Sequence, residues 1–597
     1  MTMKHLVRHA FDRFFRKQPP CAKRSFANTA RLPALTCAAS ALLWVTAVMA
    51  APSTPGLNLV LQPAAADAQG AVPSIDVALE IDALAVKKGA TLLQINLMDS
   101  ATVTSAKQIH DLQVEDAKGA LRLTAQDETL TSSEQIRRWH ADRDVQGAVK
   151  LRYRVAIDPG SPLNGTPMFE VRTGEGAVSG AGLAFLLLPD DSVERMLRVR
   201  WRLPAGEQGQ ALSSLGVGDV DSPRPLTVDE VRHLYFMQGK LGVFQAKDGG
   251  FVGAWTGTPL FPAERVMRWT ETLHTYYMTF FHSDAARFVV LTRANPHNPG
   301  SGIGLTDSFA FTYGPATTEE GIQLLLAHEM FHAFMVDMPA NEAARQSTAW
   351  FSEGLAIYYQ RMLPLRAGLI DRAMFLHDLN RSAAQYYTNS ARHGTNVEVF
   401  DKFWTDARFR LLPYNRGSMY FAQLDAAIRA HSAGKRSLDD LVLAVIAEHR
   451  AGRPVDEALW RKLLLAEAGR QAVADYQAMQ MGKLVLPPSN AFGPCFRRVL
   501  RKTRPFDPGV AMSTFASPKK VVGLIAGSEA DKAGLRNGDT VLKGGPGDAL
   551  LNDPGQTMTL TIRRGAQTFD VTYLPRGAPV DTYQWEQAGA PQCDQTP

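Results

Sequence analysis

The spacing of apolar residues changes along the chain, and the period of β-strands comes first. Between residues 148 and 157, apolar side chains at every second position alternate with basic ones, as in a strand with one exposed face. Residues 197–203 repeat this alternation. We therefore expect residues 73–222 to form a β-rich, sandwich-like N-terminal domain. The preceding residues 51–72, rich in Ala and Pro, are expected to be a linker.

A helical period follows and predicts a mainly helical domain over residues 223–487. Residues 308–311 are expected to be the edge strand of a small sheet, to which an extended peptide could add. Helices are expected over residues 263–281, 318–335, 348–361, 371–387, 416–431, 438–449 and 455–466.

The last part of the chain, residues 495–580, is β-rich again and predicts a third, small domain. A strand at 521–525, a short helix, a strand at 540–542 and a terminal hairpin over 558–573 are expected there. Residues 581–597 would then be a tail. The whole chain is thus expected to be a multidomain α+β protein.

Cys495 and Cys593 are the two cysteines that follow the N-terminal leader, and they bracket this third domain. A pair at the two ends of a small domain could form a disulfide in an oxidising compartment, while two free thiols are equally compatible with the sequence.

The N-terminus has the composition of an export signal. A basic leader precedes the apolar run 32–50, and small residues before Ala51 offer a cleavage site, so residues 1–50 are expected to be a signal peptide. An uncleaved membrane anchor is the alternative. No other apolar stretch is long enough to span a bilayer, so we expect an exported, periplasmic or secreted protein with no stable membrane insertion after cleavage.

The overall charge gives no sign of a nucleic-acid partner. The chain has 597 residues and a formal net charge of +5, and residues 1–50 alone contribute +7 through eight Lys/Arg and one Asp, which leaves −2 for the rest. Without a basic excess in the mature chain, we expect no nucleic acid to be bound.

The sequence His-Glu-Met-Phe-His at residues 328–332 carries the chemistry. On a helix, His328 and His332 lie at i and i+4 and project from one face, where they can share a metal ion. Glu329 lies beside that face and can take a proton from water. A catalytic zinc needs a third protein ligand, and Glu353 is the candidate.

The start of the helix that carries these histidines is marked by a capping box. Thr317 is expected to be the N-cap and Glu320 the third helical residue, which places His328 in mid-helix. Without Glu353, a buried helix whose histidines make ordinary hydrogen bonds would explain the motif equally well.

Three segments, residues 328–332, 350–354 and 413–417, occur in the order seen in gluzincin peptidases, and their layout most resembles the glycyl-aminopeptidase family. The resemblance implies a β-rich N-terminal domain, a thermolysin-like catalytic domain and a PDZ-like C-terminal domain. It also implies one Zn²⁺ per chain, and these roles: His328, His332 and Glu353 as zinc ligands, Glu329 as general base, and Tyr414 as the donor that steadies the oxyanion.

The same resemblance points to substrate-binding residues and to a departure from the family. Members carry a glutamate upstream of the zinc helix that suits a free amino terminus, and here Asp307 stands in its place. With Asp307 we expect Ser308, Phe309, Ala310 and Arg416, the last standing where lysine is usual, to contact substrate. Because aspartate is shorter than glutamate, aminopeptidase specificity stays open.

Two functions follow from these patterns. The first is an exported zinc metallopeptidase that acts on peptides or proteins, as an aminopeptidase or as an endopeptidase of short peptides. The second is an inactive exported scaffold whose PDZ-like domain holds a peptide tail. The complete set of three ligands and Glu329 favours the first.

Overall fold

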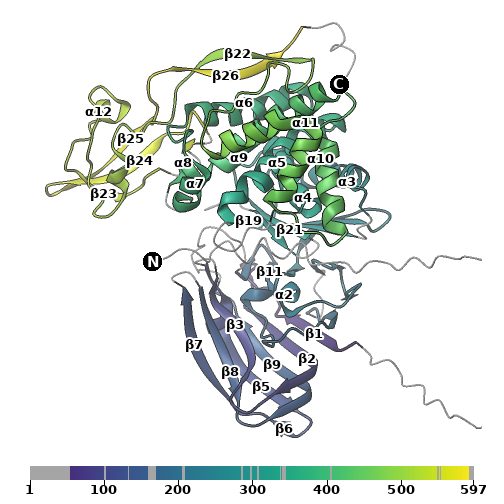
Figure 1. Cartoon of the computed structure of the whole chain (residues 1–597). Helices are drawn as coiled ribbons and strands as arrows, with labels where there is room; N and C mark the ends of the chain where they lie inside the picture. The colour runs from purple at the N-terminus through teal and green to yellow at the C-terminus, as the bar shows by residue number, and fades with distance from the viewer. Residues whose placement is uncertain are drawn as a thin grey trace, which may run out of the picture.

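The computed structural model contains three regions: a β-rich N-terminal region, a helical region built around a small sheet, and a small C-terminal β unit (Figure 1). The predicted multidomain α+β architecture is therefore confirmed. The structure describes residues 54–99, 102–131, 134–158, 170–204, 209–283, 287–295, 299–300, 302–305, 308–336, 338, 345–403, 406–546, 550–551 and 553–589, with backbone alone at 131 and 345–347.

Two sheets of the N-terminal region share one hydrophobic core, because alternate side chains of both point into it. The first has the order β15 (Val220–Asp221), β12 (Met196–Trp201), β1 (Gly56–Pro63), β2 (Ser74–Val86), β9 (Val145–Ala156), β5 (Ile109–Asp116), β6 (Gly119–Ala120). The second has the order β4 (Thr102–Val103), β3 (Thr91–Asp99), β8 (Glu134–Ala141), β7 (Leu123–Thr131).

Strand β1 corrects the prediction that residues 51–72 are a linker. It pairs with β2 on one side and runs parallel to β12 on the other, so it lies inside the sheet. Its alternate residues Leu57, Leu59 and Leu61 are at most 1% exposed. The Ala- and Pro-rich composition around it hid this short alternating pattern.

A third sheet continues the N-terminal region past residue 222, the boundary expected from the sequence. Residues 235–239 form its central strand, and their side chains belong to the N-terminal core. Its order is β10 (Arg172–Gly174), β11 (Ala177–Ala181), β16 (Tyr235–Gly239), β13 (Gln210–Ser213), β14 (Gly216–Val217).

A fourth, mixed sheet joins the two large regions. Val289 and Leu291 on one face pack into the N-terminal core, while Val290, Phe309 and Phe311 on the other face pack against the helices. The order is β17 (Leu241–Gln245), β18 (Phe251–Thr256), β19 (Phe288–Ala294), β21 (Ser308–Tyr313), β20 (Gly302–Leu305).

The helices on that face supply most of a single large core, and helix α5 lies in the middle of it against α4, α6 and α9. The longer helices are α3 (Ala263–Phe280), α4 (Glu319–Phe334), α5 (Arg345–Arg366), α6 (Arg372–Thr388), α9 (Leu412–His431), α10 (Leu438–Arg450) and α11 (Glu457–Gln480). The short ones are η1 (Ser105–Gln108), η2 (Gly182–Ala184), α2 (Val228–Arg232), α7 (Asn396–Lys402) and α8 (Ala407–Arg410).

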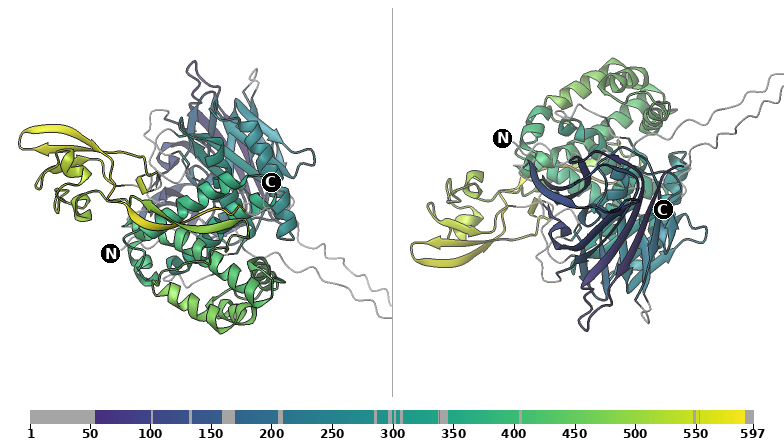
Figure 2. Two further views of the ribbon diagram at one scale, coloured as in Figure 1. Left: turned by 90° about the horizontal axis from the view of Figure 1, so that it is seen from above. Right: turned by 90° about the horizontal axis from the view of Figure 1, so that it is seen from below.

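A two-stranded ribbon of β22 (Phe496–Thr503) and β26 (Val580–Gln587) covers α6, where the Asn380 side chain bonds both the N–H and the carbonyl of Trp585. The chain between these strands, residues 504–579, forms the C-terminal unit, which projects from the side of the helices (Figures 1 and 2). Residues 581–587 therefore belong to a strand and not to a tail.

The C-terminal unit has its own small core of Val510, Val521, Leu560 and their neighbours. Residues 521–525, expected to be a strand, are not one, because Gly523 has a positive φ of 64° that interrupts the extended backbone. Its elements are η4 (Met512–Phe515), α12 (Glu529–Lys532), β23 (Thr540–Lys543), β24 (Met558–Arg564) and β25 (Gln567–Tyr573).

Two terminal features expected from the sequence lie at least partly outside the described residues. Cys495 is disulfide-bonded, and Cys593, with which the sequence allowed a disulfide, is among the residues that the structure does not describe. The leader at 1–50 is also outside them. Among the described residues, no helix is long and apolar enough to cross a membrane.

Candidate metal centre

Three side chains from α4 and α5 converge with their metal-binding atoms facing one another. The Nε2 atoms of His328 and His332 are 3.3 Å apart, and Glu353 Oε2 lies 3.3 Å from the first and 3.5 Å from the second. They form the one His/Cys/Asp/Glu cluster of ligand geometry in the part of the chain that the structure describes.

The spacing of these atoms fits zinc. A tetrahedral ion with ligands at about 2.05 Å places any two ligand atoms about 3.3 Å apart, close to all three separations in the structure. The set of two imidazole nitrogens and one carboxylate oxygen is also one that Zn²⁺ prefers. The residues present therefore fit a bound zinc ion.

The start of α4 differs from the prediction by one residue. Thr318, not Thr317, is the N-cap, and its hydroxyl accepts a hydrogen bond from the Gly321 N–H. The Thr317 hydroxyl instead accepts from the Gly314 N–H in the preceding turn. The expected capping box with Glu320 is therefore wrong, although the histidines still lie in mid-helix.

The close packing of α5 against α9 brings Tyr414 to the metal ligands. Gly354, next to Glu353, faces Gly417 of α9, and a Cβ on either residue would lie 2.7 Å from backbone atoms of the other helix. The Tyr414 ring lies nearly parallel to that of His328, with 6.2 Å between ring centroids. The Tyr414 side chain thus lies next to the three converging side chains.

The two carboxyl groups of the site have pKa values shifted in opposite directions. Burial opposes ionisation of Glu353, but the neighbouring imidazoles of His328 and His332 outweigh it and lower the pKa of Glu353 to about 2. Burial raises the pKa of Glu329 above its ordinary value. An ionised carboxylate, Glu353, therefore lies in the same site as a carboxylate of greater basicity, Glu329.

Tyr414 stays protonated in this setting. Burial, followed by the charges of Glu353 and Glu329, holds the pKa of its hydroxyl well above the ordinary value. A protonated hydroxyl can donate a hydrogen bond to an oxygen that gains negative charge.

Of the residues expected to bind substrate, Ser308, Phe309 and Ala310 prove to be covered. They lie in β21, which is not an edge strand, because it pairs with β19 on one side and β20 on the other. All three side chains are at most 2% exposed. The outermost strand next to the site is β20, and Asp307 lies outside the described residues.

Arg416 is also wrongly placed by the prediction, since it is fully buried and bonds within the protein. Its guanidinium donates to the carbonyl of Gly394 and to the side chain of Asn396. Burial lowers its pKa to about 10. The Arg416 guanidinium therefore supports the start of α7.

Sequence reasoning missed Gly302 and Gln360. A Cβ on Gly302 would lie 2.7 Å from the Phe309 ring and 3.4 Å from Glu329 Oε1, so β20 passes directly in front of Glu329. The Gln360 side chain bonds His328 Nδ1 at 3.1 Å. Its position seven residues after Glu353, on the same face of α5, was the available signal.

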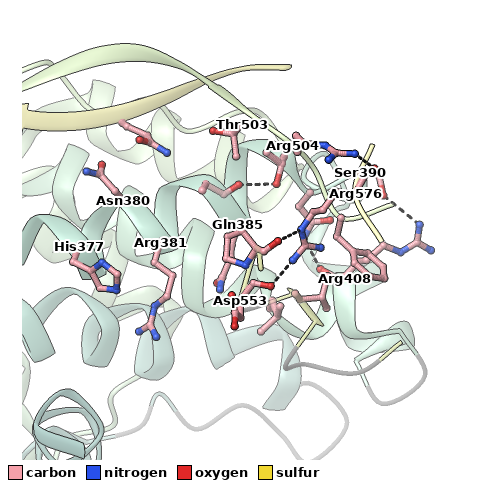
Figure 3. Close-up of a pocket in the computed structure, with 18 of the residues that line it drawn as sticks. His377, Asn380, Arg381, Gln385, Ser390, Arg408, Thr503, Arg504, Asp553 and Arg576 are labelled. Atoms are coloured by element: carbon pink, nitrogen blue, oxygen red, sulfur yellow. Dashed lines mark hydrogen bonds between the residues drawn. The ribbon is translucent and has the colours of Figure 1, made fainter. Parts of the chain in front are cut away.

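A separate cavity of about 630 Å³ lies between α6 and the C-terminal unit (Figure 3). Arg381 and Gln385 of α6 line it on one side, and Arg504 and Arg576 of the C-terminal unit on the other. None of the three residues that converge at the metal centre is among its lining residues.

Part of the chain is similar to a known family. Residues 322–408, from α4 to α8, match the family model of M61 glycyl aminopeptidases. No curated protein matches the chain.

Among solved structures, an aminopeptidase N family protein from Idiomarina loihiensis is similar with a TM-score of 0.61 and 14% identity, over 89% of this chain and 98% of that one. An M1 zinc metallopeptidase from Deinococcus radiodurans gives a TM-score of 0.39 at 15% identity, over 73% and 94%. The first of these similarities supports the arrangement of a β-rich N-terminal region followed by a helical region.

Proposed function

We propose that this chain is an exported zinc-dependent metallopeptidase that removes residues from the amino terminus of peptides. The observation that carries the proposal is the triangle of His328, His332 and Glu353 at zinc spacing, with Glu329 next to it. The match of residues 322–408 to a glycyl aminopeptidase family model supports the aminopeptidase part.

Bound zinc would supply positive charge that polarises a water molecule and a peptide carbonyl. The protein's own groups do the rest. Glu329, whose basicity burial raises, takes a proton from the attacking water and returns one to the leaving amine. The Tyr414 hydroxyl donates a hydrogen bond to the carbonyl oxygen as negative charge develops on it.

The substrate backbone would pair with β20, the outermost strand of the mixed sheet. Gly302 leaves room there, because its missing side chain lets the strand run beside Glu329. An extended peptide on β20 would thus present its carbonyl near the proton acceptor.

Two further features belong to this proposal. Residues 1–50 would be cleaved as a signal peptide, which would place the enzyme in the periplasm or outside the cell. The C-terminal unit would be a PDZ-like domain, supported by its separate core and by its short helix and terminal hairpin. Such a domain could bind a peptide tail.

The test is a digest of a mixed peptide library, read by mass spectrometry, with free and with acetylated amino termini. Protein that contains about one zinc per chain should shorten the free peptides from their amino terminus and leave acetylated ones intact. Equal cleavage of both sets would replace the aminopeptidase with an endopeptidase. Protein that takes up no zinc and cleaves nothing would leave the peptide-binding scaffold as the function.

A further inference from the structure

A chain of buried hydrogen bonds leads from the metal centre into the helical core. His328 Nδ1 lies 3.1 Å from Gln360 Oε1, and Gln360 Nε2 donates to Asp378 Oδ2 at 2.9 Å. The three residues come from α4, α5 and α6, and their exposed fractions are 8%, 4% and 0%. Three helices are therefore tied together behind one metal ligand.

Asp378 is held as a carboxylate by cations on two sides. Arg361 Nε donates to its Oδ2 at 2.7 Å, and Arg381 donates to its Oδ1 at 2.6 Å. Although burial opposes its ionisation, the charges of Arg361 and Arg381 keep the pKa of Asp378 below its ordinary value. An ionised carboxylate can only accept hydrogen bonds.

This restriction fixes the side-chain amide of Gln360. Only its NH₂ group can face Asp378, so its carbonyl oxygen must face His328. A carbonyl oxygen accepts, so the proton of the His328 ring must lie on Nδ1. In the neutral ring, which is the form that binds a metal, the Nε2 atom then has the lone pair, and it points at Glu353 Oε2 and His332 Nε2.

From this geometry we infer that Gln360 and Asp378 are positioning residues that hold His328 in the Nδ1-protonated form and so keep Nε2 ready for the metal. The inference rests on the proposed zinc site. It assigns no catalytic step to either residue, since neither touches the three converging ligand atoms.

A contribution to folding stability is a poor explanation of the buried Arg361–Asp378 pair. A fully buried Arg361–Asp378 ion pair loses its hydration on both sides, and such pairs are commonly no more stable than apolar residues of the same volume. Arg361 also leaves its NH1 group without a hydrogen bond among the described residues. The pair is better explained by the orientation it imposes on Gln360.

The first test substitutes Gln360→Met in the full chain, which keeps the length of the side chain and leaves Arg361 and Asp378 paired. Zinc affinity, measured by competition with a chelator, should fall roughly 10–100-fold, because this is the usual effect of removing a hydrogen bond to a metal-binding histidine. In metal-free protein, ¹⁵N NMR of the histidine rings should show His328 protonated on Nδ1, and this preference should be lost in the variant.

The matched control is Gln323→Met, the same exchange at a buried amide on α4 that bonds Glu319. It should leave both the zinc affinity and the His328 proton unchanged. An equal loss in this control would mean that any buried amide matters, which would overturn the inference.

A rescue experiment separates orientation from packing. Asp378→Asn offers Gln360 an amide in place of a carboxylate, so the Gln360 amide can turn over and zinc affinity should fall. Adding Gln360→Glu to this variant restores both contacts. The new carboxylate accepts from His328 Nδ1 on one side and from the amide introduced at position 378 on the other, so most of the zinc affinity should return. If Asp378→Asn does not fold, Gln360→Met decides alone.

Wild-type zinc affinity and an unchanged His328 proton in Gln360→Met would overturn the inference while leaving the proposed peptidase untouched. Conversely, the proton position in metal-free protein is independent of hydrolysis. A confirmed Nδ1 proton in an enzyme that cleaves no peptide would therefore sink the proposed function alone.

Discussion

Gly354 of α5 and Gly417 of α9 meet backbone against backbone, since a Cβ on Gly354 would lie 2.7 Å from the Gly417 Cα. Glu353 precedes the first of these glycines, and Tyr414 lies one turn before the second. The contact thus sets the distance between a metal ligand and the expected oxyanion donor, which come from segments 61 residues apart in the chain.

Substitution Gly354→Ala should destabilise the protein and weaken catalysis together. The added methyl group forces the two helices apart, and overpacking of this kind costs about 1–3 kcal/mol. Urea unfolding measures the first effect and kcat the second. Gly589→Ala is the control, because a Cβ there meets nothing within 4 Å. Equal stability of the two variants would mean that α5 and α9 can separate freely.

Local spacing was enough to predict the helix that carries His328 and His332 and the convergence of these residues with Glu353. The i, i+4 pattern of His328 and His332 depends on one helix alone, and Glu353 follows on the next. The bounds of α4 differ from the prediction by one residue at each end, whereas α5 begins three residues earlier and ends five residues later than expected.

Features that depend on distant partners could not be predicted in this way. Whether β21 or β20 is the edge strand depends on which strands pair across the sheet, and the sequence of either strand alone does not show this. The sequence does not show that Arg416 is buried, because its hydrogen-bond acceptors, Gly394 and Asn396, lie about 20 residues earlier in the chain. The insertion of residues 504–579 between β22 and β26 depends on a pairing across more than 70 residues.

Glu329→Gln should keep the metal and remove hydrolysis. The amide has the size of the carboxylate but cannot take a proton, and general base catalysis contributes about 10²–10⁴-fold to rate. Zinc content by mass spectrometry and kcat on a free peptide measure the two properties. Retained hydrolysis with bound zinc would show that another group accepts the proton.

Tyr414→Phe should lower kcat about 10²–10³-fold with little change in zinc content, because it deletes one donor to the developing oxyanion. Tyr420→Phe is a matched control on the same helix. The Tyr420 ring is buried and packs against Trp350 and Tyr476, so the removal of its hydroxyl should leave kcat unchanged. Similar kcat values for both variants would remove Tyr414 from the mechanism.

The C-terminal unit should lose stability as the pH falls below the ordinary range of aspartate, because of Asp539. Both oxygens of this buried carboxylate accept from Arg564, at 2.7 Å each. Since Arg564 holds the pKa of Asp539 below its ordinary 3.8, the folded state binds this proton less readily than the unfolded state.

The sign of the effect follows from that difference. The stabilisation is complete above the unfolded pKa of 3.8 and is lost as the pH falls toward the lower folded pKa. We expect a loss on the order of 1 kcal/mol in the free energy of unfolding between pH 5 and pH 2 that Asp539→Asn does not show. Asp570→Asn, at an exposed residue of β25 that accepts from Thr561, should keep the wild-type pH dependence. An equal slope in Asp539→Asn and wild type would mean that the Arg564 pair contributes nothing to folding, because its loss on protonation would leave the unfolding free energy unchanged.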